Sequence, residues 1–426
     1  MQHAPARQDD PILWCAAITL AFLALALHRL GIPSRIYFDE VHYTKAARSL
    51  LQLVPANSEH PPFAKEVIAA AIALFGDKPI VWRLPSLFMG TLGFFAFGRA
   101  MWWLTGRRFA TISAMTLVAT GFAWFVQSRI AMLDIYAVGL GMTGLWQFAA
   151  AMRDNGMAAR RRLCVTGLCI GLALASKWSI VPVAVLPGLI LLAARLKLHG
   201  LTSGTWKTGH PAPGISLLEA AFWLGLFPLL VYWLTFLPTF FYVRHPVGPL
   251  DFIAHHQHMI DLQDSVVKHH PYQSVWYQWV IDWRPIWYLY ENVDGAQRGV
   301  LMLGNPLTMI AGLPAVLWCL WAGLLRQRWD ALVLVSAYAA TLGLWILSGK
   351  PVLFYYHYLL PGTFLLGCLA LVLDAIWQAK RYWRWLAPAT IGASIAMFAW
   401  FYPILSAAPL KGTHAFLHWM WLDSWR

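Results

Sequence analysis

Charged residues are scarce in this chain of 426 amino acids, and carboxylates are scarcer than cations. Only 12% of the residues are charged, with 19 acidic against 32 basic side chains, whereas 59% are hydrophobic. So little charge excludes a disordered chain and argues against a soluble globular protein. The chain also lacks the glycine fingerprint of a dinucleotide-binding unit and any soluble segment large enough to house a nucleotide sugar.

Cysteine is rare as well. All of the cysteines lie within or at the edges of long apolar segments, and no Cys-x-x-Cys pair occurs. Their positions are Cys15, Cys164, Cys169, Cys319 and Cys368. Neither a disulfide in an outer loop nor a cysteine metal site is therefore predicted, and we interpret the thiols as small buried apolar groups.

Apolar sequence, in contrast, is abundant. Runs long enough to cross a bilayer, about 17 to 25 residues, recur from end to end. The eleven predicted spans lie near residues 12–30, 80–103, 109–126, 134–152, 163–176, 179–196, 217–242, 300–325, 330–348, 358–377 and 385–405. The first lacks a small-residue cleavage site, so we expect a retained helix and not a signal peptide. The pattern predicts an all-α integral membrane protein with about eleven transmembrane helices, in which residues 1–426 form one domain.

The net charge of +13 follows the loops between these spans and does not indicate nucleic-acid binding. Fourteen basic residues occupy five short loops on one side: Arg107 and Arg108; Arg153 and Arg160 to Arg162; Arg195, Lys197 and Lys207; Arg326 and Arg328; Lys380, Arg381 and Arg384. The three short loops on the other side carry only Arg129, Lys177 and Lys350. Because the basic side of a membrane protein faces the cytoplasm, we expect the N-terminus in the cytoplasm and the C-terminus outside.

The first long outer segment covers residues 31–79. Its apolar spacing predicts an amphipathic helix over about 40–53 that lies along the membrane surface, with Asp39 as its cap. Two consecutive prolines then separate it from a second predicted helix over about 63–74.

Ionisable side chains gather in this segment, although charge beside hydrocarbon is costly. Asp39 and Glu40 are adjacent, and His60 and Lys65 enclose the run His-Pro-Pro-Phe-Ala-Lys. Each has an ordinary structural interpretation. A carboxylate at a helix start can be a cap or a charge that the helix dipole favours, and a His-Pro-Pro run can be only a turn.

Arg129 and Lys177 belong to short loops on the same predicted face. Alone, each can be a basic residue that extends from a helix end toward water, and Asp134 could pair with Arg129 in a structural ion pair. In combination with Asp39 they indicate chemistry, because a carboxylate can take a proton from a hydroxyl and Arg or Lys can hold a phosphate. The set is suited to displacement of a phosphate leaving group, as with a lipid-phosphate donor.

The second outer segment, residues 243–299, is rich in His and Trp and predicts an aromatic cap over the outer face. Its aromatic residues are Trp276, Tyr277, Trp279, Trp283, Trp287 and Tyr288. They could form an interfacial belt. Alternatively, part of the segment folds back over Asp39 and walls a sugar pocket, where His270 or Arg284 could reach a hydroxyl or the phosphate.

Metal dependence stays open. Asp39, Glu40 and Glu59 could ligate a divalent cation such as Mg²⁺ or Mn²⁺. The histidines at 255–258 do not place three ligands on one helix face, and no cysteine supports a zinc site there, so we favour stacking and polar anchoring within the aromatic cap.

Seven short motifs occur in a fixed order. They are Phe-Asp-Glu-Val-His (38–42), His-Pro-Pro-Phe-Ala-Lys (60–65), Ser-Arg-Ile-Ala-Met-Leu-Asp (128–134), Ala-Ser-Lys-Trp (175–178), His-Pro-Tyr-Gln-Ser-Val-Trp-Tyr-Gln-Trp (270–279), Arg-Pro-Ile-Trp-Tyr (284–288) and Leu-Gly-Asn-Pro (303–306). The ordered set resembles the protein O-mannosyltransferases over about residues 35–310. The lysine that closes the His-Pro-Pro motif favours this family over the related aminoarabinose transferases of lipid A.

The resemblance implies a glycosyltransferase of the GT-C class that passes mannose, with inversion, from polyprenyl-phosphate-mannose to Ser or Thr hydroxyls of proteins. It implies that Asp39, with Glu40 beside it, is the catalytic acid-base group. It also implies that Arg129 contacts the donor phosphate, and Lys65 and Lys177 are further candidates for that role. The expected substrate-binding residues are His60, His270 and Arg284.

The loop between the seventh and eighth spans, about 55 residues, is too short for the lumenal β-trefoil module of the eukaryotic members. We therefore expect a bacterial type of enzyme in the inner membrane, with its active site on the periplasmic side and a groove between spans for the polyprenyl tail. Two alternatives stay open: the same donor chemistry on a glycolipid or envelope polysaccharide, and a transporter of lipid-linked sugar. The crowding of ionisable residues at one face, and not at the membrane midplane, argues against the transporter.

Overall fold

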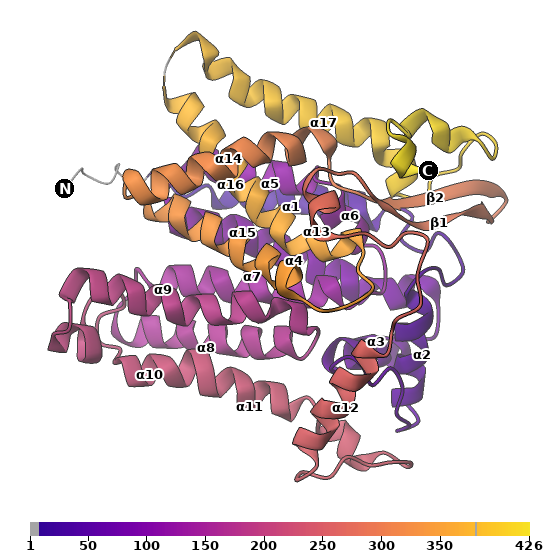
Figure 1. Ribbon diagram of the computed structural model, residues 1–426, viewed down its shortest axis with the longest axis horizontal. Helices are drawn as coiled ribbons and strands as arrows, with labels where there is room; N and C mark the ends of the chain where they lie inside the picture. Colours follow the sequence, from indigo (N-terminus) through magenta and orange to yellow (C-terminus); the bar gives the residue numbers. More distant parts are fainter. Residues whose placement is uncertain (1–7, 380) are drawn as a thin grey trace.

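Long helices pack side by side along one direction in this protein (Figure 1). The structure is a computed structural model that describes residues 8–379 and 381–426. The long helices are α1 (Ile12–Leu27), α4 (Pro79–Thr105), α5 (Arg108–Ala119), α7 (Asp134–Ala151), α8 (Gly156–Leu174), α9 (Val181–His199), α14 (Pro306–Leu325), α15 (Trp329–Leu347), α16 (Leu359–Gln378) and α17 (Leu386–Leu405). A further rod runs from α10 (Leu217–Ala221) through a π-helical turn, Phe222–Leu226, to α11 (Phe227–Leu234).

Each of the eleven predicted spans contains at least part of one of these helices, although the count of eleven is not confirmed. Among the described residues, seven helical stretches are long and apolar enough to cross a membrane. They are Pro79–Thr105, Trp178–His199, Leu217–Phe241, Pro306–Leu325, Trp329–Leu347, Tyr355–Gln378 and Tyr382–Leu405. α1 and α5 are shorter apolar helices. Lys380, one of the basic loop residues, lies outside the described residues.

The third predicted span is interrupted. α5 ends at Ala119, and after a bend at Phe122, which has a positive φ of 66°, the chain is helical again in α6 (Ala123–Gln127). Unpaired backbone groups are costly at membrane depth. The Asn305 side chain donates to the Thr120 carbonyl at 2.9 Å, and the hydroxyls of Thr120 and Ser394 share a hydrogen bond of 2.6 Å. Polar groups before α14 and within α17 therefore support the interruption.

α7 is enclosed by its neighbours because α4 approaches it at two glycines. A Cβ atom on Gly93 would lie 2.3 Å from the Cα of Gly139, and a Cβ on Gly139 would lie 2.3 Å from the carbonyl oxygen of Met89. Small residues of this kind let membrane helices pack backbone to backbone. The contact positions Asp134, the first residue of α7, at the end of the bundle where the outer segments gather.

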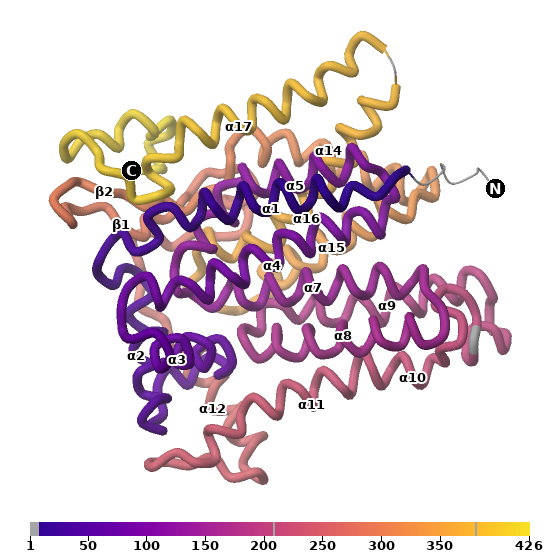
Figure 2. The backbone as a smooth tube through the Cα atoms, turned by 180° about the vertical axis from the view of Figure 1, so that it is seen from behind, coloured from indigo at the N-terminus to yellow at the C-terminus, as the bar shows by residue number. Residues whose placement is uncertain are grey.

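Short elements cover that end of the bundle. They are α2 (Glu40–Leu50), α3 (Phe63–Phe75), α12 (Phe252–Asp264) and α13 (Trp276–Val280), and the C-terminal segment lies with them, opposite the first described residues (Figures 1 and 2). The two predicted helices of the first outer segment are confirmed, apart from shifts of up to three residues at their ends. Both long outer segments share one end, as the alternation of loops predicts. The side of the bilayer that this end faces stays a prediction.

The predicted helical architecture is confirmed, apart from one β-hairpin that the prediction did not include. β1 (Ile286–Val293) pairs antiparallel with β2 (Ala296–Met302), and the connecting residues Asp294 and Gly295 have φ values of 50° and 72°. Two positive φ values in a two-residue loop define a type I′ turn, for which Asp-Gly is a preferred sequence. The prediction placed these residues in the aromatic cap and at the start of a span near residue 300. That span begins instead at Pro306.

The C-terminal segment, residues 406–426, holds the hairpin and the loop before it. The N–H of Leu410 donates to the carbonyl of Gln297 in β2 at 2.8 Å. The indole N–H of Trp425 donates to the carbonyl of Asp282 at 2.8 Å. The chain end and the second outer segment thus form one unit.

Substitution of Gly139 by Ala should push α4 and α7 apart, because the new Cβ would collide with backbone. Overpacking of this kind costs about 1–3 kcal/mol of stability. Gly343→Ala in α15 is the matched control, since nothing lies within 4 Å of its Cβ position, and alanine there should be neutral or slightly stabilising. Thermal unfolding in one detergent compares the two variants. Equal melting temperatures would contradict the close helix contact.

Candidate active site

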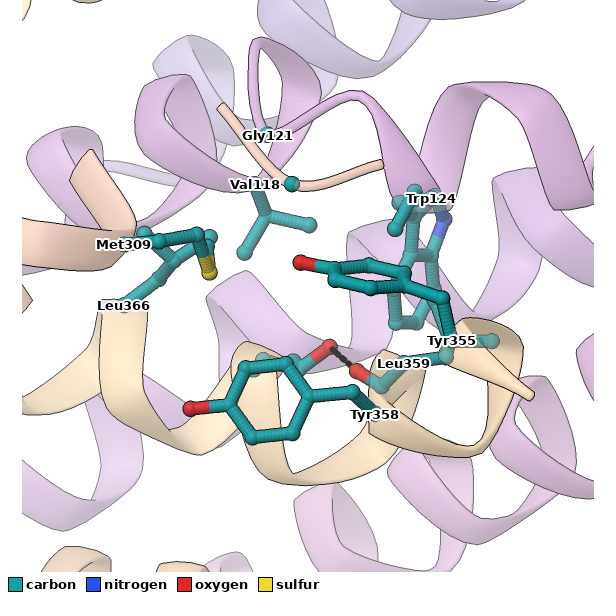
Figure 3. A pocket seen from close by; sticks show the side chains of 12 residues that line it. Val118, Gly121, Trp124, Met309, Tyr355, Tyr358, Leu359 and Leu366 are labelled. Atoms are coloured by element: carbon teal, nitrogen blue, oxygen red, sulfur yellow. Dashed lines mark hydrogen bonds between the residues drawn. The ribbon is translucent and has the colours of Figure 1, made fainter. Parts of the chain in front are cut away.

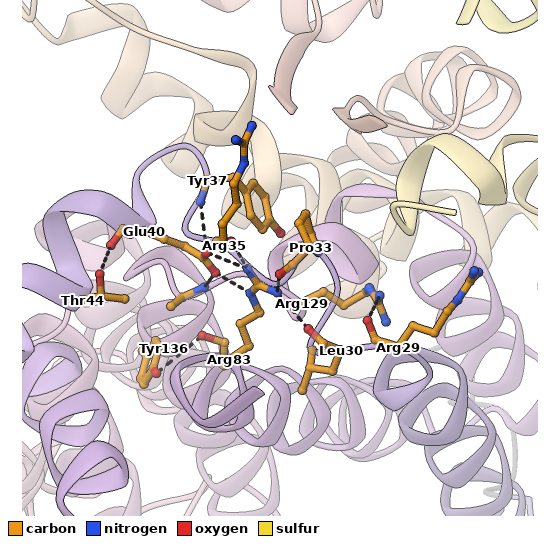
Figure 4. A network of polar contacts seen from close by, with 12 residues as sticks. Arg29, Leu30, Pro33, Arg35, Tyr37, Glu40, Thr44, Arg83, Arg129 and Tyr136 are labelled. Atoms are coloured by element: carbon orange, nitrogen blue, oxygen red, sulfur yellow. Dashed lines mark hydrogen bonds and ion pairs between the residues drawn. The ribbon is translucent and has the colours of Figure 1, made fainter. Parts of the chain in front are cut away.

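Glu40 is completely buried and bonded to Arg83 of α4. The Nε and Nη2 atoms of Arg83 donate to the two carboxylate oxygens at 2.7 and 2.9 Å (Figure 4). The backbone N–H of Ala131 donates to the same carboxylate at 3.1 Å. The Nη1 atom of Arg83 donates to the carbonyls of Leu30 and Pro33 at 3.1 and 2.8 Å. The pair therefore connects four segments: the chain after α1, the start of α2, helix α4, and the residues before α7.

This geometry does not support the prediction that Glu40 is catalytic. Both of its oxygens accept hydrogen bonds from Arg83, and neither side chain is exposed. A carboxylate whose two oxygens are held in this bidentate way has no oxygen directed at a substrate hydroxyl. Arg83 was missed because no sequence motif marks it.

Asp39 differs from its neighbour because it has no bonded partner. Its side chain forms no hydrogen bond or ion pair within the described part of the chain, and it does not cap α2 as predicted. The charged groups that act on it are Lys177, His42, Asp134 and Lys350. Burial raises the pKa of the Asp39 carboxyl to about 6, and the Lys177 ammonium opposes this rise. A carboxylate with uncommitted oxygens and this pKa is suited to act as a general base.

Lys177 connects the end of α8 with the start of α7. Its Nζ lies 2.8 Å from both carboxylate oxygens of Asp134, and 5.1 Å from the ring centre of Tyr356. The interpretation that paired Asp134 with Arg129 is therefore wrong. The carboxylate balances the charge of Lys177 and fixes the direction of its side chain.

A cavity of about 480 Å³ opens beside this ion pair. Its polar and aromatic lining consists of His60, Lys177, Trp178, Ser179, Gln263, Asp264, Trp345, Ser348, Lys350 and His357. The first outer segment, the turn before α9, the end of α12, the end of α15 and the connection from α15 to α16 all contribute. Lys177 and Lys350 also act electrostatically on Asp39, so the carboxylate lies within electrostatic range of this cavity.

Lys350 is a cation of this cavity without a carboxylate partner. Its ammonium forms no hydrogen bond or ion pair with any described residue, although its pKa is lowered by burial and by Lys177. Burial, together with Lys177 and Lys65, lowers the pKa of His60 well below its usual value, which keeps its imidazole neutral. The Asp264 carboxylate lines the same cavity and acts on Lys350 electrostatically, without an ion pair. The cavity thus offers a cation outside the ion pairs of the described residues and a neutral imidazole, groups that can bind a phosphate and sugar hydroxyls.

The second outer segment folds back toward Asp39 through Tyr288 in β1. The Tyr288 ring stacks on Phe38 with the ring centres 4.1 Å apart, and its hydroxyl accepts a hydrogen bond from the Gln127 side chain at 2.8 Å. The other aromatic residues divide between two environments. Trp279 and Trp287 are buried, whereas Tyr277 and Trp283 are exposed. Only part of the set can therefore belong to an interfacial belt.

His270 and Arg284 do not line the cavity, contrary to the prediction that they bind substrate. The guanidinium of Arg284 donates to the carbonyls of Ser424 and Pro271 at 2.7 and 2.8 Å. The Nδ1 of His270 accepts from the backbone N–H of Tyr272 at 3.1 Å. Arg284 thereby holds the second outer segment against the chain end, whereas His270 forms its hydrogen bond within the segment.

Arg129 and Lys65 are also committed to backbone carbonyls. Arg129 donates to the carbonyls of Ala26, His28, Arg29 and Ser406. It thereby satisfies the carbonyl of Ala26 in the last turn of α1, which lacks a partner within the helix. The ammonium of Lys65 donates to the carbonyls of Asn57 and His60 at 2.6 and 2.7 Å. These contacts do not support the predicted role of either residue at the donor phosphate.

A chain of hydrogen bonds holds α12 against the cavity. The indole N–H of Trp178 donates to the hydroxyl of Tyr232 at 3.1 Å, and that hydroxyl lies 2.6 Å from Nε2 of His256. Nδ1 of His256 lies 2.7 Å from the carbonyl of Phe252. Because a carbonyl only accepts, Nδ1 carries the proton and Nε2 accepts from Tyr232. His256 thus anchors α12, in agreement with the predicted polar and stacking role of these histidines.

No group of three or more His, Cys, Asp or Glu side chains converges on a metal position among the described residues. Glu40, one of the three carboxylates considered as ligands, is bonded to Arg83. Dependence on Mg²⁺ or Mn²⁺ stays a prediction.

A second void, between α5, α14 and α16, is too small to hold a sugar. It measures about 20 Å³ and is lined by Trp124, Met309, Tyr355 and Tyr358, among others (Figure 3). Such a volume admits about one water molecule. The cavity beside Asp39 is therefore the better candidate for the substrate site.

Comparison with known proteins decides the family. Residues 16–87 and 80–243 match the family described as dolichyl-phosphate-mannose-protein mannosyltransferase, and residues 250–425 match the C-terminal four TMM region of protein-O-mannosyltransferase. The chain belongs to the protein O-mannosyltransferase family.

Relatives of this mannosyltransferase align over most of its length. The polyprenol-phosphate-mannose–protein mannosyltransferase of Mycolicibacterium smegmatis is 26% identical and covers 96% of this chain and 93% of its own. The protein of the same description from Mycobacterium tuberculosis is 26% identical and covers 91% of this chain and 86% of its own.

Solved structures confirm the GT-C architecture. The S. cerevisiae Pmt1-Pmt2 complex bound to the sugar donor matches with a TM-score of 0.84 at 14% identity, covering 99% of this chain and 93% of that chain. ArnT from Cupriavidus metallidurans bound to undecaprenyl phosphate matches with a TM-score of 0.58 at 17% identity, covering 96% and 78%. At these identities the likeness shows the fold alone.

The two adjacent carboxylates of this mannosyltransferase should respond differently to amide substitution. Glu40→Gln leaves Arg83 buried without a counter-charge, which costs about 3–5 kcal/mol. Asp39→Asn removes no hydrogen bond, so it should leave folding intact or improve it. Glu291→Gln is the matched control, because Glu291 pairs with Arg35 at a surface where both are about half exposed and such pairs contribute little. The fraction of monodisperse protein after detergent extraction and heating reports the difference. A Glu40→Gln variant as stable as Glu291→Gln would refute the structural role.

Proposed function

We propose that this protein transfers mannose from polyprenyl-phosphate-mannose to Ser or Thr hydroxyls of proteins, with inversion at the anomeric carbon. The names of the relatives, which are polyprenol-phosphate-mannose–protein mannosyltransferases, support this donor and this acceptor. The observation that carries the proposal is the Asp39 carboxylate, which is uncommitted and lies within electrostatic range of a cation-lined cavity.

In the proposed step, Asp39 acts as the base. The acceptor oxygen attacks C1 of mannose and forms the new C–O bond, while its proton passes to the Asp39 carboxylate. The bond between C1 and the phosphate oxygen breaks, and polyprenyl phosphate departs with that electron pair. A single displacement of this kind inverts the anomeric carbon. The phosphate leaves without a proton of its own if positive charge stabilises it.

Lys350 is our first candidate for that positive charge. Asp134 already balances Lys177, whereas Lys350 has no carboxylate bonded to it. His60 and His357 line the same cavity and can donate or accept hydrogen bonds at the sugar or the phosphate. Trp178 and Trp345 supply aromatic faces on which the apolar side of a hexose can lie.

The reaction is proposed to take place at the periplasmic face of a bacterial inner membrane. The short loops that are rich in basic residues lie at the end of the bundle opposite α2, the helix that follows Asp39, which supports a cytoplasmic location for them. A lipid-linked donor fits an active site at the membrane surface, because its polyprenyl tail stays in the bilayer between spans while its sugar reaches the cavity.

Asp39→Asn should lower turnover by about 10²- to 10⁴-fold, the usual worth of a general base. The assay combines purified protein, polyprenyl-phosphate-mannose and a Ser/Thr peptide. The base works only when deprotonated, so wild-type kcat/KM should fall about tenfold per pH unit below the pKa of Asp39, about 6. The free energy of unfolding should change in the opposite direction and decrease with rising pH. The raised pKa of Asp39 in the folded state contributes stability that is lost as the pH rises through about 6.

Asp423→Asn controls for this variant, because Asp423 is 93% exposed and lies at the same end of the molecule. Full turnover by Asp39→Asn, or a pH profile that stays flat between 5 and 7, would show that another group is the base. Addition of a chelator to the wild-type assay decides the metal dependence separately.

Lys350→Met should lower kcat/KM for the lipid donor by about 10- to 100-fold, because a charged hydrogen bond to phosphate contributes about 1.5–3 kcal/mol. Lys350→Arg should retain part of the activity. Lys411→Met is the control, since Lys411 is an exposed lysine in the C-terminal segment. Donor titration at fixed peptide separates the effects on KM and kcat. An unchanged response to donor in Lys350→Met would remove Lys350 from the phosphate site.

A further inference from the structure

A second large cavity lies at the opposite end of the helix bundle from Asp39. Its volume is about 530 Å³, and it is formed by the last parts of α4, α7 and α9 and the first part of α15. Apolar side chains such as Leu186, Leu334 and Phe364 make up most of its wall. Leu198 and Trp329 also line it and are 63% and 41% exposed. The cavity is therefore reached from the surface of the bundle near these two residues.

Two cations, Arg153 and Lys197, also line this cavity. The ammonium of Lys197 donates to the neutral side chain of Gln327 and lies 4.4 Å from the ring centre of Trp329. No carboxylate takes part in these contacts, so they do not balance its charge. Four arginines at this end form ion pairs with carboxylates. Those pairs are Arg107 with Asp374, Arg160 with Glu219, Arg162 with Asp154 and Arg328 with Asp330.

We propose that this cavity binds an anionic glycerophospholipid of the leaflet at the basic end, with one acyl chain inside and the phosphate at Lys197 and Arg153. Basic pockets between membrane helices at the cytoplasmic side hold anionic headgroups, and burial of an acyl chain removes apolar area from water and from the headgroup region. The mannose donor does not supply the anion for Lys197, because its own phosphate must lie near Asp39 at the other end.

The lipid site shares two helices with the candidate active site. α9 follows Trp178 and α15 precedes Ser348, and both of these residues line the cavity beside Asp39. The opposite ends of the same helices line the lipid cavity. A bound acyl chain therefore fixes the spacing of α9 and α15. Because Lys177 precedes α9 and Lys350 follows α15, the lipid should reduce the motion of both side chains and raise turnover. This effect on turnover rests on the proposed function, whereas the binding of the lipid does not.

The binding test uses the full chain, delipidated in detergent and titrated with phosphatidylglycerol or phosphatidylcholine of identical acyl chains, with native mass spectrometry as the readout. The wild type should retain one phosphatidylglycerol at least tenfold more tightly than phosphatidylcholine. Lys197→Gln should abolish this preference. Ala194→Phe should abolish retention of both lipids, because Ala194 lines the cavity and the larger ring would fill it. Arg161→Gln is the control, since Arg161 is exposed at the same end and is absent from the lining.

Three results would overturn the proposal. The first is an unchanged preference in Lys197→Gln. The second is competition by glycerol 3-phosphate as strong as that by the intact lipid, which would reduce the site to an anion patch. The third is displacement of phosphatidylglycerol by polyprenyl phosphate at equal concentration, which would assign the cavity to the tail of the donor.

Turnover in nanodiscs tests the coupling. Wild-type turnover should be several-fold higher with phosphatidylglycerol than with phosphatidylcholine, and Ala194→Phe should not respond to the change. Equal wild-type rates in both lipids would refute the coupling. Absence of mannosyl transfer in every lipid, with binding as expected, would instead refute the proposed function and leave the lipid site standing.

Discussion

The buried ion pair of Glu40 and Arg83 is the constraint on which the end of this mannosyltransferase that holds α2 and α3 depends. Two charges removed from water are stable only if their remaining donors and acceptors are satisfied. All five N–H donors of Arg83 have acceptors, two on the Glu40 carboxylate and three on the carbonyls of Leu30, Pro33 and Arg35. The pair thus fixes the chain between α1 and α2 from several sides. The loop that precedes α2 has little freedom as a result.

This ion pair gives the adjacent carboxylates different roles, a structural one for Glu40 and a proposed catalytic one for Asp39. Glu40 holds the backbone in place, so Asp39 needs no hydrogen bond of its own to be positioned. A base that was oriented by a cation or by backbone N–H groups would become less basic. Here its neighbour supplies the orientation, and burial keeps the Asp39 pKa near 6. Preorganisation and basicity, which usually oppose one another, are therefore compatible at this position.

The sequence permitted prediction of the helices, because long apolar runs need no knowledge of their partners. Asp39, His60 and Lys177 could be expected at one end, since the alternation of spans places their loops on the same side. The prediction failed for side chains whose role depends on their packing partners in the folded chain. An arginine at a helix end looks alike whether it binds phosphate or, as Arg129 does, accommodates four carbonyls.

Other features were hidden for related reasons. Lys350 stands alone in a short loop without a motif, and only the folded chain shows that it faces the same cavity as Lys177. The strands of the hairpin are largely buried, so their sequence lacks a clear alternation and resembles the start of a span. Its turn, Asp294-Gly295, was the one local signal.

The attachment of the chain end to the second outer segment has a consequence for synthesis. Trp425 bonds to the carbonyl of Asp282, and Arg284 and Trp287 bond to the carbonyls of Ser424 and Trp425. The loop that these bonds hold is made long before residues 424 and 425 leave the ribosome, and several further helices must enter the membrane in between. This end of the molecule is therefore completed late, after the polypeptide as far as residue 425 has been inserted. A chain released early would keep its motifs but lack the hydrogen bonds between the chain end and the second outer segment.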